Sequence, residues 1–167
     1  MKFISFNHDN SEKFGIIENN LITDLTGKID GASSLKELIK IKKIKEAKEY
    51  AKSNPGSIKP DQIEYSPLIP NPGKIICVGL NYSEHVKETN RTVEENPVIF
   101  HRFPESQTAH MQAIQRPTVS ESLDFEGEMA VVMDEGGKHI KPEDALKHIV
   151  GFSCYNESTI REWQRHT

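Results

Sequence analysis

The chain has 167 residues, of which 35% are apolar and 28% charged, and its formal net charge is -4 with a pI near 6.0. A chain of this length can bury a substantial core, which indicates one globular domain or one domain with a small appendage. Its acidic balance gives no electrostatic reason to expect nucleic acid or an anionic membrane as a partner. No apolar run has the length of a membrane span, and the N-terminus lacks the apolar core of a signal peptide, so we expect a cytoplasmic protein.

Alternating apolar residues near the N-terminus predict a small antiparallel sheet. Its short strands cover residues 2–6, 13–17 and 21–25, and Asn19-Asn20 forms the turn of a hairpin. A single helix is expected next, because apolar residues recur at helical spacing from Leu35 to Ala51 after Ser33 or Ser34 as the cap. The sequence therefore begins with a sheet covered by one helix.

The predicted helix is rich in lysine, with seven lysines against three glutamates from Lys36 to Lys52. Such a density is compatible with a nucleic-acid patch. However, Lys42 and Lys45 are each followed by a glutamate four residues later, and such pairs are typical of a solvated helix face. We favour the solvated face.

Five of the nine prolines fall between Pro55 and Pro72. Proline in this density keeps a segment extended and outside β-ladders. We therefore place a boundary there, which divides the chain into an N-terminal subdomain over residues 1–66 and a second domain over residues 72–167.

The second domain is predicted to be rich in strands. Cys77 and Cys154 lie in apolar strand-like runs, so we expect reduced, buried thiols, and neither has a neighbour at the spacing of a disulfide or zinc site. A helix is expected from Asn81, directly after a strand that ends in Gly79, and a short helix from Pro142. The predicted strands are residues 74–78, 97–103, 129–133 and 149–155.

Glu126 and Glu128 are the centre of the functional hypothesis. They precede the apolar run from Met129 to Met133, which is typical of a buried strand, and residues two apart on a strand share a face. Two neighbouring carboxylates are costly to bury without a cation, and Mg²⁺ prefers oxygen ligands. Glu157, after the last strand, is a possible third carboxylate. The alternative is that the glutamates are simply exposed to water.

Other polar residues suggest a catalytic base and an anion-binding group. His85 and Glu88 are three apart on a predicted helix, so the carboxylate can orient the imidazole as a general base, although the alternative is an ordinary surface hydrogen bond. Arg102 lies on a strand, where its planar guanidinium suits capture of a carboxylate, or else forms a surface salt bridge.

Together these residues resemble the fumarylacetoacetate hydrolase family, which also includes acylpyruvate hydrolases, oxaloacetate decarboxylases and catechol-pathway hydratases, isomerases and decarboxylases. The resemblance covers residues 72–167. It is carried by four ordered blocks: Ile76-Cys77-Val78-Gly79-Leu80-Asn81-Tyr82 with His85 and Glu88; Pro97 to Phe100; Asp124-Phe125-Glu126-Gly127-Glu128-Met129-Ala130-Val131-Val132; and Gly151 with Asn156-Glu157, Arg161 and Gln164.

The resemblance implies an α+β, strand-rich fold, with the small N-terminal sheet and helix followed by a mixed β-roll catalytic domain. It also implies a homodimer and a site that takes a small 2-oxo acid. The implied roles are Mg²⁺ or Mn²⁺ ligation by Glu126, Glu128 and Glu157, a base dyad of His85 and Glu88, and substrate contacts from Arg102 and Gln164.

Two departures from the family pattern are visible. Many members have Asp where this chain has Glu157, which keeps the ligand type but moves the oxygen. In addition, the family's catalytic domain continues beyond the position of Thr167, so we expect this domain to be incomplete.

The function expected from the resemblance is divalent-metal-dependent hydrolysis of C–C bonds in acylpyruvate or diketo acids. One alternative is a lyase, decarboxylase, hydratase or isomerase of the same family, including a ureidoglycolate lyase, because the same scaffold supports several reactions. An alternative of another class is a non-catalytic, metal-stabilised interaction module.

Overall fold

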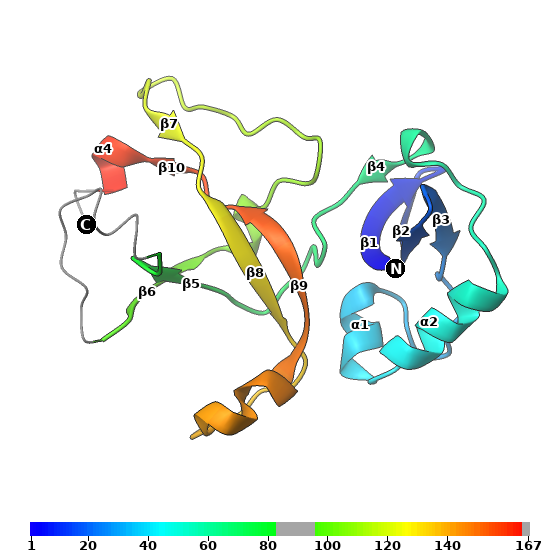
Figure 1. Cartoon of the computed structure of the whole chain (residues 1–167). Helices are drawn as coiled ribbons and strands as arrows, with labels where there is room; N and C mark the ends of the chain where they lie inside the picture. The colour runs from blue at the N-terminus through cyan, green and yellow to red at the C-terminus, as the bar shows by residue number, and fades with distance from the viewer. Residues whose placement is uncertain (83–95, 165–167) are drawn as a thin grey trace.

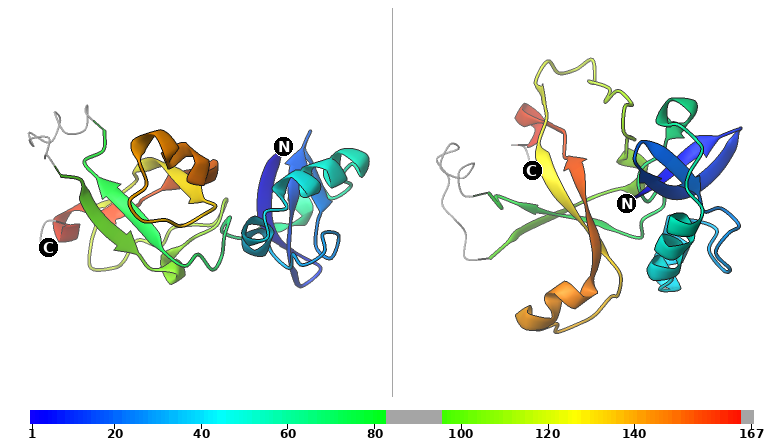
Figure 2. Two further views of the ribbon diagram at one scale, coloured as in Figure 1. Left: turned by 90° about the horizontal axis from the view of Figure 1, so that it is seen from below. Right: turned by 45° about the vertical axis from the view of Figure 1, so that its right-hand side comes forward.

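The computed structural model describes residues 1–82 and 96–164. It has the predicted α+β, strand-rich architecture. An N-terminal unit of one sheet and two helices is joined by an extended segment to a second unit built from strand pairs (Figures 1 and 2). The proposed boundary, residues 1–66 and 72–167, stays a prediction.

The N-terminal sheet has the strand order β3-β2-β1-β4 and is antiparallel throughout. Its two hairpins turn at Asp9-Asn10 and Asn19-Asn20, and all four of these residues have positive φ. Two-residue turns of this kind match the twist of the flanking strands and favour Asn and Asp. The predicted hairpin is thus confirmed. The strands are β1 (Lys2–His8), β2 (Ser11–Glu18), β3 (Leu21–Asp24) and β4 (Glu64–Tyr65).

The prediction of one helix is wrong, because two helices form: α1 (Leu35–Lys40) and α2 (Ile44–Ser53). Ser34 caps α1 by accepting a hydrogen bond from the Glu37 N–H at 3.2 Å. The helix ends because Lys42 adopts a left-handed conformation with φ 59°. The Lys42 N–H then donates to the Ile39 carbonyl (2.9 Å) and the Lys43 N–H to the Leu38 carbonyl (3.2 Å), the two bonds of a Schellman motif.

The core of the N-terminal unit lies between the helices and one face of the sheet. Both helices contribute apolar side chains at helical spacing, and the strands contribute aromatic and aliphatic ones. Burial of these side chains is the main stabilising term for the unit. The buried cluster is Phe14, Ile16, Leu25, Ile29, Ala32, Leu35, Leu38, Ile39, Ala47 and Ala51.

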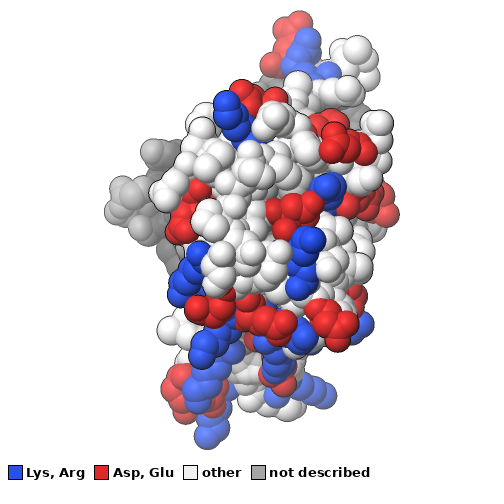
Figure 3. All heavy atoms as spheres, turned by 90° about the vertical axis from the view of Figure 1, so that its right-hand side faces the viewer, with Lys and Arg blue, Asp and Glu red and all other residues white. Residues whose placement is uncertain are grey.

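The lysine-rich face carries charges of both signs, which are interspersed over this side of the molecule (Figure 3). Lys43 pairs with Glu46 at 3.3 Å and Lys52 with Glu49 at 2.9 Å. The expected pair of Lys42 with Glu46 is wrong, because Lys42 instead reaches Glu135 in the second unit at 2.7 Å. This mixture supports the solvated face over a nucleic-acid patch.

The proline-rich segment is less detached than predicted. Ile58 first forms an isolated antiparallel bridge with Ile22 of β3. A short 3₁₀ turn, η1 (Pro60–Gln62), follows, and then β4 pairs with β1 through Phe6 opposite Tyr65. The expectation that the segment stays unpaired is therefore wrong at Ile58 and at β4. Two residues without proline are enough for this short edge pairing.

The second unit consists of three antiparallel strand pairs in its described residues. Predicted strands near residues 74–78, 97–103 and 149–155 are confirmed, whereas β7 and β10 were not foreseen. The pairs are β5 (Ile75–Gly79) with β6 (Val98–Arg102), β8 (Gly127–Met133) with β9 (Ile149–Asn156), and β7 (Leu123–Asp124) with β10 (Thr159–Ile160); the helical turns are η2 (Pro104–Ser106), η3 (Pro142–His148) and α4 (Arg161–Gln164).

The predicted strand at residues 129–133 is confirmed as part of β8, but its expected burial is wrong for one face. Met129 is 61% exposed and Phe152, on β9, is 59% exposed. Cys154 is exposed on β9 and Cys77 is half-buried on β5, so the expected burial of both thiols is also wrong in part. Val132 and Val150 pack against the N-terminal core instead. The β8–β9 ribbon is thus covered on one face only.

Because Lys42 has a left-handed conformation, a glycine at this position should give a more stable protein than an alanine, which is the reverse of the order within a helix. Replacing Lys42 with Gly should give a protein that is more stable than Lys42→Ala by about 0.5–1 kcal/mol, because only the alanine has a Cβ that opposes positive φ. Both variants lose the contact with Glu135, so the comparison isolates the backbone. Urea denaturation measures the difference.

The matched control is Lys48, which lies in the middle of α2. There, the alanine variant should be the more stable of the two by about 1 kcal/mol, because glycine is unfavourable within a helix. A Lys42→Gly protein that is less stable than Lys42→Ala would contradict the assigned helix break.

Candidate metal and substrate site

The pairing of β8 with β9 brings Glu126 and Glu157 together. Gly127 lies opposite Asn156, so Glu126 lies opposite Glu157, and the Glu157 N–H donates to the Glu126 carbonyl at 2.8 Å. Residues directly opposite each other in an antiparallel pair share a face. Glu128 is two residues further along β8 and therefore lies on that face as well. The backbone thus places all three predicted metal ligands on one side of the ribbon.

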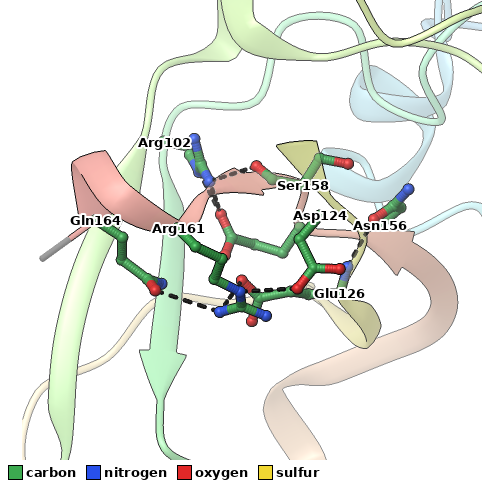
Figure 4. Close-up of polar contacts among 8 residues, drawn as sticks. Arg102, Asp124, Glu126, Asn156, Ser158, Arg161 and Gln164 are labelled. Atoms are coloured by element: carbon green, nitrogen blue, oxygen red, sulfur yellow. Dashed lines mark hydrogen bonds and ion pairs between the residues drawn. The ribbon is translucent and has the colours of Figure 1, made fainter. Parts of the chain in front are cut away.

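Glu157 is the most buried of these acids, with a side chain that is 7% exposed. Arg102, at the end of β6, contacts its Oε1 through both Nε and Nη2, and the same Nη2 donates to the Ser158 carbonyl at 3.0 Å (Figure 4). Burial raises the pKa of Glu157 above its ordinary value. Arg102 opposes this increase in pKa, while the charges of Glu126 and Glu128 add to it. The three carboxylates therefore interact electrostatically.

A second arginine, Arg161 at the start of α4, lies beside Glu126. Its Nε donates to Asp124 Oδ2 at 2.8 Å, and its Nη1 donates to the Gln164 side-chain oxygen at 3.2 Å (Figure 4). The same Nη1 lies 3.1 Å from Glu126 Oε1 and forms an ion pair with it. This oxygen is nevertheless buried without a hydrogen bond, since the alignment is poor.

The short strands β7 and β10 determine where Arg161 lies. Asp124 is opposite Thr159 in this pair, and α4 follows β10 directly. On the other side of α4, buried Ser120 donates a hydrogen bond from its hydroxyl to Glu162. The helix carrying Arg161 is therefore held by contacts on two sides.

Asn156 fixes the backbone of the site at its centre. Its side-chain oxygen accepts a hydrogen bond from the Glu126 N–H at 3.0 Å (Figure 4). Together with the bond between the Glu157 N–H and the Glu126 carbonyl, this satisfies both backbone groups of Glu126. The carboxylate of Glu126 is thereby carried on a defined backbone rather than on a loose turn.

The types of residue in this cluster suit a hard divalent cation. Carboxylate oxygens are the ligands that Mg²⁺ prefers, and an inner oxygen of Glu126 lacks a hydrogen bond. In residues 1–82 and 96–164, however, no three or more His, Cys, Asp or Glu side chains are placed so that they could hold a metal ion. The guanidinium groups of Arg102 and Arg161 lie among the carboxylates instead. Cation binding would require these carboxylates to rotate and to exchange their guanidinium partners for the cation.

The predicted site residues divide into three groups. Glu126 and Glu157 lie together with Arg102, which contacts Glu157, while Glu128 shares their face. Gln164 lies in the same region but contacts Arg161. His85 and Glu88 lie outside the described residues, so the base dyad stays a prediction.

The sequence-based reasoning assigned no role to Asp124, Asn156 or Arg161. Asp124 continues the two-residue spacing of Glu126 and Glu128, and this repeat of carboxylates was a usable signal. The pairing of Arg161 with Asp124 had no such signal, because it depends on two strands of two residues each.

Comparison with known sequences gives a clear result for the second unit. The family model described as "Fumarylacetoacetate (FAA) hydrolase C-terminal" matches residues 74–167, which is more than half of the chain. The chain belongs to the fumarylacetoacetate hydrolase family. The resemblance inferred from the four ordered blocks is thereby confirmed, and the family is one of enzymes whose members are named as hydrolases and tautomerases.

Curated relatives in the family are named as oxaloacetate tautomerases. The protein from Rattus norvegicus, "Oxaloacetate tautomerase Fahd2a, mitochondrial", is 40% identical over 103 residues, which are 62% of this chain and 33% of the relative. The Xenopus laevis protein is 38% identical over 118 residues, or 71% of this chain and 37% of the relative. The chain thus spans about a third of the length of these relatives.

Solved structures in the family confirm the fold. The fumarylacetoacetate hydrolase from Exiguobacterium antarcticum has a TM-score of 0.81 and 28% identity, covering 99% of this chain and 58% of that one. Maleylpyruvate hydrolase from Sphingobium sp. SYK-6, solved with manganese(II) and pyruvate, has a TM-score of 0.77 and 20% identity, covering 96% and 60%. At that identity the likeness concerns the fold alone.

The location of this family member in the cell stays a prediction. No helix within the described ranges is long and apolar enough to cross a membrane. The names of the two curated relatives place those proteins in mitochondria, so the cytoplasmic location that we expected has no support from them.

The contact between Arg102 and Glu157 predicts unequal effects of removing either partner. Arg102→Met should destabilise the chain by about 2–3 kcal/mol, because it leaves a buried carboxylate without its cation. The loss is smaller than for a fully buried pair, because the Arg102 side chain is 33% exposed. Glu157→Gln should cost only about 1 kcal/mol. Thermal or urea unfolding of both variants measures these losses.

The double variant provides the control, because Arg102→Met should cost much less when Glu157 is already Gln. The cost of Arg102→Met alone should also grow as the pH rises above the ordinary pKa range of a glutamate. Burial and the neighbouring carboxylates raise the pKa of Glu157, the loss of Arg102 removes the opposing effect, and the folded state then loses stability as Glu157 ionises. Equal costs in both backgrounds would show that the two side chains are not coupled.

Proposed function

We propose that this chain carries the metal-binding part of an enzyme that acts on 2-oxo acids, with Glu126, Glu128 and Glu157 as ligands of Mg²⁺ or Mn²⁺. The observation that carries the proposal is the arrangement of three carboxylates on one face of the β8–β9 ribbon, among them a buried Glu126 oxygen without a hydrogen bond. The manganese and pyruvate in the structure of the related maleylpyruvate hydrolase support this chemistry.

The cation would supply a Lewis acid that binds the 2-oxo acid end of the substrate and stabilises an enolate. The chain's own side chains supply the complementary charge. Arg102 and Arg161 border the carboxylates, and a planar guanidinium can hold a substrate carboxylate through two hydrogen bonds. Gln164, beside Arg161, adds an amide that can donate to a substrate oxygen.

The first candidate reaction is the hydrolysis of acylpyruvate or diketo acids. In this proposal His85, oriented by Glu88, removes a proton from water, the resulting hydroxide attacks the acyl carbonyl, and the C–C bond breaks to leave a carboxylic acid and the enolate of a 2-oxo acid. The enolate then takes up a proton. For acetylpyruvate the products are acetate and pyruvate.

The names of the curated relatives favour a second candidate, keto–enol tautomerisation of oxaloacetate or a similar acid. This reaction needs the same enolate and a proton transfer, but no attack by water. Other lyase, decarboxylase, hydratase or isomerase reactions on 2-oxo acids, including ureidoglycolate lyase, use the same scaffold. A non-catalytic, metal-stabilised module remains the alternative of another class, and a homodimer remains the expected assembly.

The metal-dependent function predicts a large effect of a single ligand. With Mn²⁺ or Mg²⁺ present, the protein should convert acetylpyruvate or the enol form of oxaloacetate, and Glu126→Gln should lower kcat/KM by roughly 100-fold or more. Ultraviolet absorbance of the enol follows both substrates, and product analysis separates hydrolysis from tautomerisation. The matched control is Asp144→Asn, which removes one carboxylate from the exposed turn η3 and should leave turnover unchanged.

Metal-dependent melting without turnover of any 2-oxo acid would favour the non-catalytic module. Chelation with EDTA should abolish turnover, and added Mn²⁺ should restore it. Full activity in EDTA would end the proposal of a metal-dependent enzyme.

His85 should be needed for hydrolysis in particular. His85→Ala should lower the rate of acetylpyruvate cleavage by about 10²–10⁴-fold, because a positioned general base contributes that much. Its affinity for Mn²⁺ should stay close to that of the unmodified chain, since His85 is not among the proposed ligands. Undiminished cleavage by His85→Ala would rule out the dyad as the base.

A further inference from the structure

The guanidinium of Arg161 is oriented by residues other than Glu126, the proposed metal ligand beside it. Asp124 receives its Nε–H at 2.8 Å, and Gln164 receives an N–H from Nη1 at 3.2 Å. Glu126 Oε1 lies 3.1 Å from the same Nη1 yet accepts no hydrogen bond from it. Two other acceptors therefore determine where the donors of this guanidinium point.

This orientation leaves an oxygen of Glu126, whose side chain is 18% exposed, without a hydrogen bond. A buried carboxylate oxygen without a donor is unfavourable, and a guanidinium so close would normally turn to satisfy it with two parallel bonds. The hydrogen bond from Arg161 Nε to Asp124 opposes that rotation of the guanidinium. The inner oxygen of Glu126 is thereby left with a cationic neighbour but without a hydrogen bond.

The charges around Glu126 support the same interpretation. Asp124, Glu126, Glu128 and Glu157 supply four carboxylates on adjacent elements, whereas Arg102 and Arg161 supply two guanidiniums. Among these described groups the carboxylates outnumber the guanidiniums, which favours the binding of a further cation.

We propose that Asp124 is a positioning residue, which keeps the Arg161 guanidinium from forming a two-bond, hydrogen-bonded ion pair with Glu126 and so preserves the affinity of the site for a divalent cation. The inference rests on the proposed metal function and deepens it. Without Asp124, the guanidinium is free to form a two-bond ion pair with Glu126 and to compete with the metal. Asp124 then acts through Arg161 rather than as a metal ligand.

The test is a double-mutant cycle on Mn²⁺ affinity with the whole 167-residue chain, measured by electron paramagnetic resonance of free Mn²⁺ and by calorimetry. Asp124→Asn should weaken Mn²⁺ binding by about tenfold. Arg161→Gln should bind Mn²⁺ at least as tightly as the unmodified chain, because a competing cation has gone. In the Arg161→Gln background, Asp124→Asn should change the affinity by less than about threefold.

Two controls protect the comparison. Asp144→Asn removes the same charge from η3, where Asp144 pairs with Lys147, and should leave Mn²⁺ affinity unchanged. Circular dichroism and the melting temperature in EDTA show whether Asp124→Asn retains the fold; if it does not, Asp124→Ser in the same cycle replaces it. Both Asp124 variants are expected to give the same dependence on Arg161.

Three results would overturn the inference. Mn²⁺ affinity that is unchanged by either Asp124 substitution would show that Arg161 is not held back by Asp124. An equal loss of Mn²⁺ affinity in both backgrounds would show that Asp124 acts independently of Arg161, as a metal ligand or as a remote charge. If the unmodified chain binds no Mn²⁺, the metal site and this inference fail together, whereas Mn²⁺ binding with the expected cycle but no turnover would refute the proposed reaction alone.

Discussion

The arrangement of charges depends on the register between β8 and β9. Glu126 lies opposite Glu157 because the Glu157 N–H bonds to the Glu126 carbonyl, and Asn156 holds the Glu126 N–H from the same strand end. A slip of one residue would send one carboxylate to the other face of the ribbon. The proximity of the acids is thus imposed by backbone pairing, and the two arginines must accommodate it.

Burial of a carboxylate beside two others is unfavourable unless a cation or a proton compensates. Glu157 illustrates both responses: burial and its neighbours raise its pKa, while the contact with Arg102 keeps the charged form accessible. Arg102 reaches it from β6, a strand that belongs to a different pair in the sheet topology. The site therefore links two strand pairs through charge, and any divalent cation that binds there must exchange with a guanidinium for Glu157.

The sequence predicted those parts of the structure that follow from local periodicity. The Asn19-Asn20 hairpin and the shared face of Glu126 and Glu128 are such cases. It failed at Lys42, because lysine gives no signal for a left-handed conformation where glycine or asparagine would. It also missed the contact between Asp124 and Arg161, since that contact depends on tertiary pairing of two very short strands. Residues 129–133 resembled a buried strand because an unbroken apolar run does not reveal which face is covered.

The two ends of the β8–β9 ribbon make different contacts. Glu128 and Val132 lie on the same face, but Val132 packs against the N-terminal core while Glu128 lies beside the carboxylate cluster. Just beyond β8, Glu135 binds Lys42 of the α1–α2 turn. The N-terminal unit thus supports the end of the ribbon opposite the site, and the left-handed turn at Lys42 both ends α1 and directs a lysine toward that support. The other end of the ribbon is held by hydrogen bonds and ion pairs among charged side chains, so its geometry depends on their charges.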